Sequence, residues 1–128
     1  MKLIVDTHAF LWATTDDHRL SPRARALIQS GDSDLLLSAV SAYELLFKAT
    51  QGRIRLPADP ATWLNARMRS FELRWLPVTG EHAIAAAVLP RIHGDPWDRM
   101  LVAQARLEGI PILTADRGIA RYEVETIW

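Results

Sequence analysis

The sequence predicts an α/β fold in which helices cover both faces of a mainly parallel sheet. Short apolar runs of strand length alternate with longer segments of helical pattern, as in strand–helix–strand units. In three places a capping residue directly before a proline marks the start of a helix. No repeat, low-complexity stretch or long linker divides the 128 residues, so one domain over residues 1–128 is expected.

Five apolar runs are short enough to be buried strands of such a sheet. The first is "KLIV" at residues 2–5, which stops at Asp6. The second is "DLLLS" at residues 34–38. The other three expected strands are residues 73–78, 110–116 and 124–128.

The segments between these runs are expected to be helices. Ser21, Asp59 and Asp95 each precede a proline, which places an N-cap residue before a proline at the first helical position. Glycines follow several of the segments and mark their ends. The expected helices are residues 7–14, 22–30, 39–52, 59–71, 79–89 and 94–109.

The composition excludes several classes of protein. Without cysteine the chain has neither disulfides nor thiolate metal sites. It has no signal-peptide pattern and no apolar run near ~18 residues, so a soluble cytoplasmic protein without a membrane segment is expected. The net charge of zero gives no overall attraction for a polyanion. Arginine makes up 13 of the 15 basic residues, which suits phosphate contacts but also follows from a GC-rich genome.

Four acids are expected to meet at one edge of the sheet. Ligands of such sheets bind beyond the carboxyl ends of the strands, and Asp6 and Asp116 each come at the end of a strand. Glu44 is on the helix after residues 34–38, and Asp98 is at the start of the helix before residues 110–116. Such a group of carboxylates suits Mg²⁺ or Mn²⁺, and two such ions promote phosphodiester hydrolysis.

Each acid also has a structural explanation, which the sequence leaves open. Asp6 can cap the next helix, and Asp116 can begin a turn. Glu44 and Lys48 have the i,i+4 spacing of a solvated ion pair. Asp98 can belong to a capping box at the start of its helix.

Four segments together resemble a known family. The segments are "LIVDTHAFLW", "SAVSAYELLFK", "LPRIHGDPWDRMLVAQARLEG" and "PILTADRGIARY". Their order and spacing resemble PIN-domain proteins, above all the VapC ribonuclease toxins of bacterial toxin–antitoxin pairs, from Lys2 to Trp128. The resemblance implies a PIN-like three-layer α/β/α sandwich.

The resemblance also implies roles for particular residues. The catalytic and metal-site acids of the family match Asp6, Glu44, Asp98 and Asp116. Hydroxyl positions close to that site match Thr7 and Thr114. Asp95 matches a helix cap rather than a ligand.

The implied activity is that of a Mg²⁺- or Mn²⁺-dependent endoribonuclease that cuts structured RNA, such as tRNA. The implied partners are a second copy of the chain and a cognate antitoxin. We expect the antitoxin to occlude the site with a short helix that binds apolar residues of the early helices. The residues expected on this docking face are Phe10, Leu11, Trp12 and Leu46.

Basic and aromatic residues beside the acids are candidates for RNA contacts. Arg91, Arg99 and Arg117 are expected to form a local basic rim that binds phosphates. Trp97 is the tryptophan best placed to stack on a base.

His8 and His93 flank the acidic motifs. Because a site made of oxygen ligands requires no imidazole, packing or capping is the expected role of both.

Two other functions compete with a nuclease. One is a PIN scaffold that binds RNA or protein without cutting, for which a ring of acids has no use. The other is a metallophosphoesterase, whose motifs match "DTH" at 6–8 and "GDPWD" at 94–98 but require histidines that are absent after His93. A haloacid-dehalogenase-type phosphatase requires aspartate at position 8, where His8 stands.

Overall fold

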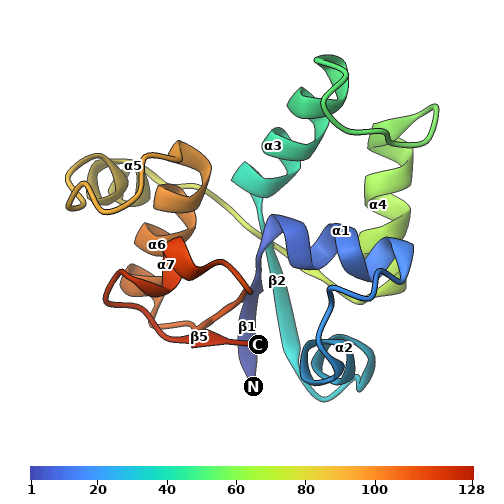
Figure 1. The fold of residues 1–128 in the computed structure, drawn as a ribbon, viewed down its shortest axis with the longest axis horizontal. Coiled ribbons are helices and arrows are strands. Elements are labelled where there is room, and N and C mark those ends of the chain that lie inside the picture. The colour runs from blue at the N-terminus through green and yellow to red at the C-terminus, as the bar shows by residue number, and fades with distance from the viewer.

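The central sheet has five strands, all of them parallel, in the order β3-β2-β1-β4-β5. The computed structural model describes all residues from 1 to 128 (Figure 1). It confirms the predicted α/β class, although the last three strands are shorter than expected. The strands are β1 Lys2–Val5, β2 Asp34–Ser38, β3 Arg74–Leu76, β4 Ile112–Leu113 and β5 Thr126–Ile127.

Seven helices connect the strands, six of them close to their expected positions. Side chains of Ser21, Asp59 and Asp95 accept backbone N–H groups as N-caps, which confirms these three predictions. The seventh helix, α7, has only four residues, too few to show helical periodicity in the sequence. No helix combines the length and the apolar composition needed to cross a bilayer. The helices are α1 Thr7–Thr15, α2 Pro22–Gln29, α3 Ala39–Thr50, α4 Pro60–Ser70, α5 Gly80–Ala87, α6 Pro96–Glu108 and α7 Arg117–Ala120.

The sheet separates two hydrophobic cores, and this makes the fold a three-layer sandwich. Successive side chains of a strand point to opposite faces, so Leu3 and Val5 of β1 belong to one core and Ile4 to the other. In Figure 1, α1, α2 and α4 lie on one side of the strands and α5, α6 and α7 on the other. Burial on both faces explains why the strands are continuous apolar runs.

One residue of the expected antitoxin-docking face belongs to the core. Phe10 is 1% exposed and packs edge-on against Trp63 and Phe71, so its predicted contact with a partner is wrong. Leu11, Trp12 and Leu46 are only partly buried and remain accessible.

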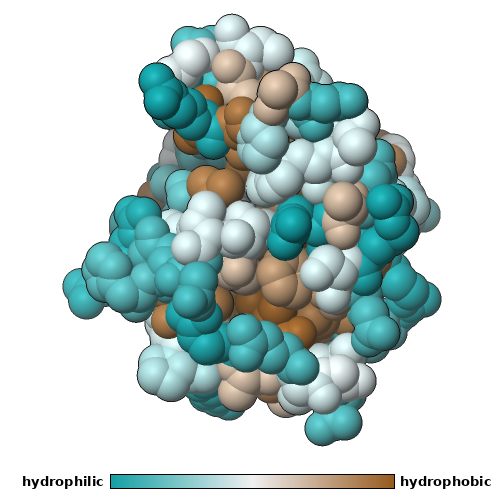
Figure 2. Space-filling model, turned by 90° about the vertical axis from the view of Figure 1, so that its right-hand side faces the viewer, coloured by the Kyte–Doolittle hydropathy of each residue, from teal (hydrophilic) through white to brown (hydrophobic).

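On the side of α4, apolar side chains lie in hollows between hydrophilic ones and do not form a continuous surface (Figure 2).

Arg99 connects α6 to the end of α5. Its guanidinium donates hydrogen bonds to the carbonyl oxygens of Ala86 (2.9 Å), Leu89 (2.9 Å) and Pro90 (3.0 Å). The carbonyls at a helix C-terminus lack helical partners and carry partial negative charge, so a cation there stabilises the end of α5. Because its donors are used inside the protein, the expectation that Arg99 binds RNA phosphate is not supported.

We predict that Arg99 contributes to stability rather than to RNA affinity. Arg99→Ala should lower the free energy of unfolding by about 2–4 kcal/mol, because it leaves several carbonyls without a charged donor. Arg91→Ala, at an exposed position in the following loop, should change it by less than about 0.5 kcal/mol. Urea unfolding monitored by circular dichroism measures both values. Equal stability of the two variants would contradict this role.

Candidate active site

The site lies at the carboxyl ends of β1 and β4, where the order of the strands reverses. The chain passes from β1 to β2 and β3 on one side, and then returns to β4 and β5 on the other. Such a reversal leaves a crevice beyond the strand ends, where the connecting helices diverge. Asp6 directly follows β1, and Asp116 lies three residues after the end of β4.

Asp6 is a buried carboxylate with one oxygen that lacks a partner. Asp6 is 3% exposed, and its Oδ2 accepts a hydrogen bond from Thr114 Oγ1 at 2.7 Å. Oδ1 is buried and has no hydrogen-bond partner. Asp6 occupies the N-cap position of α1, but its side chain makes no cap bond. The helix-cap explanation therefore does not account for its side chain.

Asp98 faces the site from the first turn of α6, while Asp95 caps that helix. Asp95 Oδ1 accepts the N–H groups of Trp97 and Asp98, as predicted for the cap. Asp98 Oδ2 instead lies 2.8 Å from His93 Nε2. His93 therefore makes a hydrogen bond to a candidate metal ligand, a contact that the expected packing or capping role does not include.

Asp116 has two roles. Its Oδ1 accepts N–H groups of Gly118 (2.7 Å) and Ile119 (3.2 Å) at the start of α7, so the turn explanation is correct. One ligand atom each from His93, Asp98 and Asp116 also lie within 4.8 Å of one another. The structure therefore brings Asp116 to Asp98 from a different segment of the chain.

Glu44 is on α3 and is neutralised locally. It is 2% exposed, and its carboxylate forms an ion pair with Lys48, which is also largely buried. The i,i+4 pair is therefore present, but the expectation that it is solvated is wrong. One turn before Glu44, Ser41 accepts a hydrogen bond from Thr7 Oγ1 at 2.8 Å, which connects the starts of α1 and α3.

Burial and mutual repulsion change the acidity of two of the acids. Desolvation raises the pKa of Asp6, and the hydrogen bond from Thr114 and the charge of His8 only partly oppose it. Desolvation also raises the pKa of Asp98, to about 7, with further increases from the charges of Asp95 and Asp6. For both carboxylates, the nearby positive charge and hydrogen bonds are therefore too weak to offset burial.

A small cleft reaches Asp6 and Asp116. It has a volume of about 260 Å³, and its lining includes Asp6, Asp116, His8, Trp12 and Arg19. The guanidinium of Arg19 lies 4.9 Å above the ring of Trp12, at the exposed side of the cleft. No sequence motif indicates Arg19, because α1 and the loop after it become part of the site only in the folded chain.

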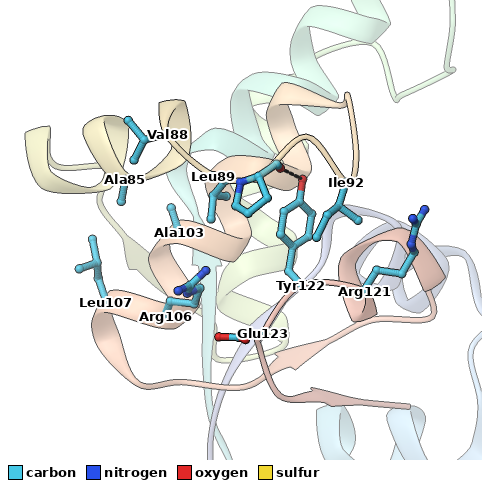
Figure 3. Close-up of a pocket in the computed structure, with 11 residues that line it drawn as sticks. Ala85, Val88, Leu89, Ile92, Ala103, Arg106, Leu107, Arg121, Tyr122 and Glu123 are labelled. Carbon is cyan, nitrogen blue, oxygen red and sulfur yellow. Dashed lines mark hydrogen bonds between the residues drawn. The ribbon is translucent and has the colours of Figure 1, made fainter.

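A larger cleft of about 640 Å³ lies elsewhere, between α5, α6 and the segment after α7 (Figure 3). Its lining is mainly apolar and contains none of the four acids. Because Glu123 is the one carboxylate in its lining, we assign the candidate active site to the smaller cleft, which contains two of the four acids.

Three aromatic side chains lie beside the acids on α3 and α6. Ring centroids are 5.2 Å apart for Tyr43 and Trp97, and 5.8 Å apart for Tyr43 and Phe47. Tyr43 is 61% exposed and Phe47 42% exposed. Tyr43 precedes Glu44 on α3 and Trp97 precedes Asp98 on α6, so this aromatic cluster joins the two helices that carry these acids.

The residues of the site fit a divalent metal ion. The unpartnered oxygen of Asp6 is a ligand position that the protein itself leaves open. Carboxylates are the preferred ligands of Mg²⁺ and Mn²⁺, and a cation would offset the desolvation and repulsion that raise the pKa values of Asp6 and Asp98.

Comparison with known proteins identifies the class. The model of the PIN domain family matches residues 3–125, and the chain belongs to this family. It is 31% identical over 130 residues to Ribonuclease VapC22 of Mycobacterium tuberculosis (strain ATCC 25618 / H37Rv), with 98% of each chain covered.

Solved structures with low sequence identity share the fold. One is VapBC2 from Rickettsia felis bound to a DNA fragment from their promoter (TM-score 0.72, 12% identity, 99% of this chain and 98% of that chain covered). Another is a toxin–antitoxin complex from Klebsiella pneumoniae (TM-score 0.68, 12% identity, 98% and 96% covered). These neighbours agree with the predicted three-layer architecture.

We predict that the metal-free protein is less stable at alkaline than at mildly acidic pH. The carboxyl group of Asp98 has a pKa of about 7 in the folded protein, against about 4 in an unfolded chain. Between about pH 4 and about pH 7, the folded protein therefore binds more protons at this group than the unfolded chain does. Stability is therefore lost as the pH rises through this window, by a few kcal/mol at most. In EDTA the melting temperature should fall by several degrees from about pH 5 to about pH 8.

Asp98→Asn should remove much of this pH dependence, with the remainder due to Asp6. Asp32→Asn, at an exposed position before β2, is the control and should keep the full dependence. A wild-type protein that is more stable at the higher pH in EDTA would contradict the prediction.

Proposed function

We propose that the protein is a metal-dependent endoribonuclease and the toxin of a toxin–antitoxin pair. The observation that carries the proposal is the buried Asp6 carboxylate, with one oxygen unpartnered, beside Asp98 and Asp116 at the reversal of the sheet. The relative with 31% identity is a ribonuclease by name, which supports the same reaction. RNA, including tRNA and other structured RNA, is the proposed substrate.

Asp6, Asp98 and Asp116 would hold the divalent ion, Mg²⁺ or Mn²⁺, with Glu44 as a further ligand. Such an ion, when bound, supplies the positive charge that activates water and stabilises the leaving oxygen. Thr114 orients Asp6 by donating to Oδ2, so that Oδ1 remains directed at the open ligand position. Thr7 supports the start of α3 through Ser41. Lys48 holds the Glu44 carboxylate in place inside the protein through their ion pair.

The surroundings of the site suit a single-stranded segment of RNA. Arg91 and Arg117 are exposed beside the acidic segments and can contact phosphates. The aromatic cluster of Tyr43, Phe47 and Trp97 offers rings on which an unpaired base can stack. Together these groups would place the phosphodiester over the carboxylates.

A cognate antitoxin is the proposed inhibitor, because several structural neighbours are toxin–antitoxin complexes. Partly buried Leu46 lines an apolar cleft between α3 and α4, which suits a short antitoxin helix better than the buried Phe10. Unchanged antitoxin affinity in a folded Leu46→Ala variant would exclude this cleft.

A homodimer is the proposed assembly. The apolar side chains of Ile84 (70% exposed), Val88 (76%) and Leu107 (50%) form a suitable contact on α5 and α6. A monomeric mass by light scattering at micromolar concentration would remove the dimer from the proposal.

The first prediction of this function concerns Asp6 and Asp98. Asp6→Asn and Asp98→Asn should each lower RNA cleavage by at least about 100-fold, because each removes a ligand charge. In EDTA both variants should melt at the wild-type temperature or higher, since neutralisation relieves repulsion and desolvation. With Mg²⁺ or Mn²⁺ the wild type should become the more stable protein, because only it gains the full binding energy.

Cleavage of total RNA with mapping of the new 5′ ends, together with thermal melts in both conditions, measures these effects. Asp32→Asn is the control for the loss of one negative charge. If cleavage persists in EDTA, a contaminating nuclease would be its source. The protein itself would then be better explained as one that binds RNA without cutting it. A variant that melts lower in both conditions yet cuts normally would make that acid purely structural.

The second prediction concerns RNA binding, measured in the inactive Asp98→Asn background. Arg91→Ala and Arg117→Ala should each weaken binding of tRNA and reduce the salt dependence of affinity by about one charge. Trp97→Ala should weaken binding without changing that slope, because stacking releases no counterions.

Arg106→Ala is the matched control, since Arg106 is exposed at the far end of α6 and lines the larger cleft. The α6 residues between Asp98 and Arg106 separate it from the site by about 12 Å along the helix. Salt slopes that are equal in all arginine variants would show that the phosphate contacts lie elsewhere.

A further inference from the structure

His93 lies among the candidate metal ligands, although the acid motif does not include it. Its Nε2 is 2.8 Å from Asp98 Oδ2, and His93, Asp98 and Asp116 each have a ligand atom within 4.8 Å of the others'. Ligands at neighbouring positions of an octahedral ion, each about 2.1 Å from the metal, are about 3 Å apart, and opposite ligands about 4.2 Å. The His93–Asp98 pair therefore has the spacing of neighbouring ligands on one ion, and Asp116 is close enough to join them after a small side-chain movement.

The backbone of His93 is held rigidly by two residues from other elements. The hydroxyl of Tyr122 accepts the His93 N–H at 3.0 Å and lies 3.2 Å from the carbonyl oxygen of Pro90 (Figure 3). Arg99 donates to that Pro90 carbonyl and lies 3.3 Å from the Tyr122 hydroxyl. Tyr122 is buried, at 4% exposed. The loop that carries the imidazole is thus held in place by the protein's own contacts.

Gly118 gives the imidazole its space. A Cβ atom at this position would lie 2.9 Å from Asp116 Oδ1 and about as close to the His93 ring, 3.0 Å from Cδ2 and 3.1 Å from Nε2. A side chain at residue 118 would therefore push His93 and Asp116 apart. The close approach of these two residues depends on glycine at the start of α7.

We infer that His93 Nε2 is a metal ligand together with Asp98 and Asp116, and that the site consequently prefers Mn²⁺ to Mg²⁺. Imidazole suits transition-metal ions, whereas Mg²⁺ binds almost entirely through oxygen and keeps several waters. Asp6, with its unpartnered Oδ1, adds an oxygen ligand beside this group. The inference rests on the metal site of the proposed function and identifies the ion that this site takes.

The alternative is that His93 only positions Asp98 through their hydrogen bond. In that case His93 acts on every divalent ion alike, because it alters the carboxylate and not the ligand set. A ligand role instead affects Mn²⁺ far more than Mg²⁺ and puts a nitrogen atom next to the bound Mn²⁺. These consequences separate the two roles without any measurement of activity.

The test uses the purified full chain with MnCl₂ or MgCl₂ and no RNA. Calorimetry measures both affinities, and pulsed EPR of bound Mn²⁺ detects coupling to ¹⁴N. The wild type should show the ¹⁴N signal, and His93→Ala should lose it. His93→Ala should also lose at least about tenfold in Mn²⁺ affinity, while Mg²⁺ affinity changes by less than about threefold.

His18→Ala is the control, because His18 is almost fully exposed in the loop after α1 and should leave both affinities and the signal unchanged. Gly118→Ala gives an independent variant that retains the imidazole, and it should weaken Mn²⁺ binding and diminish the ¹⁴N signal. Circular dichroism establishes that the variants are folded.

Absence of ¹⁴N coupling in Mn²⁺-loaded wild type, or failure to bind Mn²⁺, would overturn the inference. Equal losses for the two metals in His93→Ala, with rescue by His93→Asn, would assign His93 a positioning role instead. A protein that shows the ¹⁴N signal but cuts no RNA would retain the ligand assignment and refute the proposed nuclease. RNA cleavage by a protein that lacks the ¹⁴N signal would support the proposed nuclease and refute His93 as a metal ligand.

Discussion

Withdrawing carboxylates from water is the energetic constraint on which the site depends. Asp6 is almost completely buried and receives a single side-chain hydrogen bond, from Thr114, while Asp98 receives one from His93. Neither hydrogen bond compensates for desolvation, since the pKa values of both acids remain raised. A protein selected only for stability would replace or neutralise such groups, because an unpaired buried charge is strongly unfavourable. Binding of a cation is the compensation that their arrangement suits.

Helix α6 shows how the fold maintains this arrangement. Within its first turn, Asp95 caps the helix, Asp98 faces the site, and Arg99 holds the carbonyls at the end of α5. Arg99 and Tyr122 also fix the loop that carries His93. The same short segment therefore combines stability with positioning, and substitutions that disturb the loop are expected to affect both.

Several errors of sequence interpretation have a common physical origin. The i,i+4 spacing of Glu44 and Lys48 is the same for a solvated pair and a buried one, and only the packing of α3 decides between them. Arg99 follows a site acid in the sequence but points away from it, because successive helix residues point about 100° apart. His93 has no motif that assigns it to the acids. Its contact with Asp98 becomes evident only from the conformation of the loop.

Sequence patterns were enough to predict the parallel α/β sandwich, the three proline-marked helix starts and the placement of Asp6 and Asp116 at strand ends. These features depend on local patterns: apolar runs, cap residues and the order of strands and helices. Which side chains meet depends on the packing of the layers: Asp98 contacts His93, Asp6 contacts Thr114, and Arg99 contacts the end of α5. The burial of Phe10 and the formation of the four-residue helix α7, which has no helical periodicity in the sequence, also depend on tertiary packing. Such contacts join residues from different elements, so their geometry depends on how the layers pack and not on any one segment.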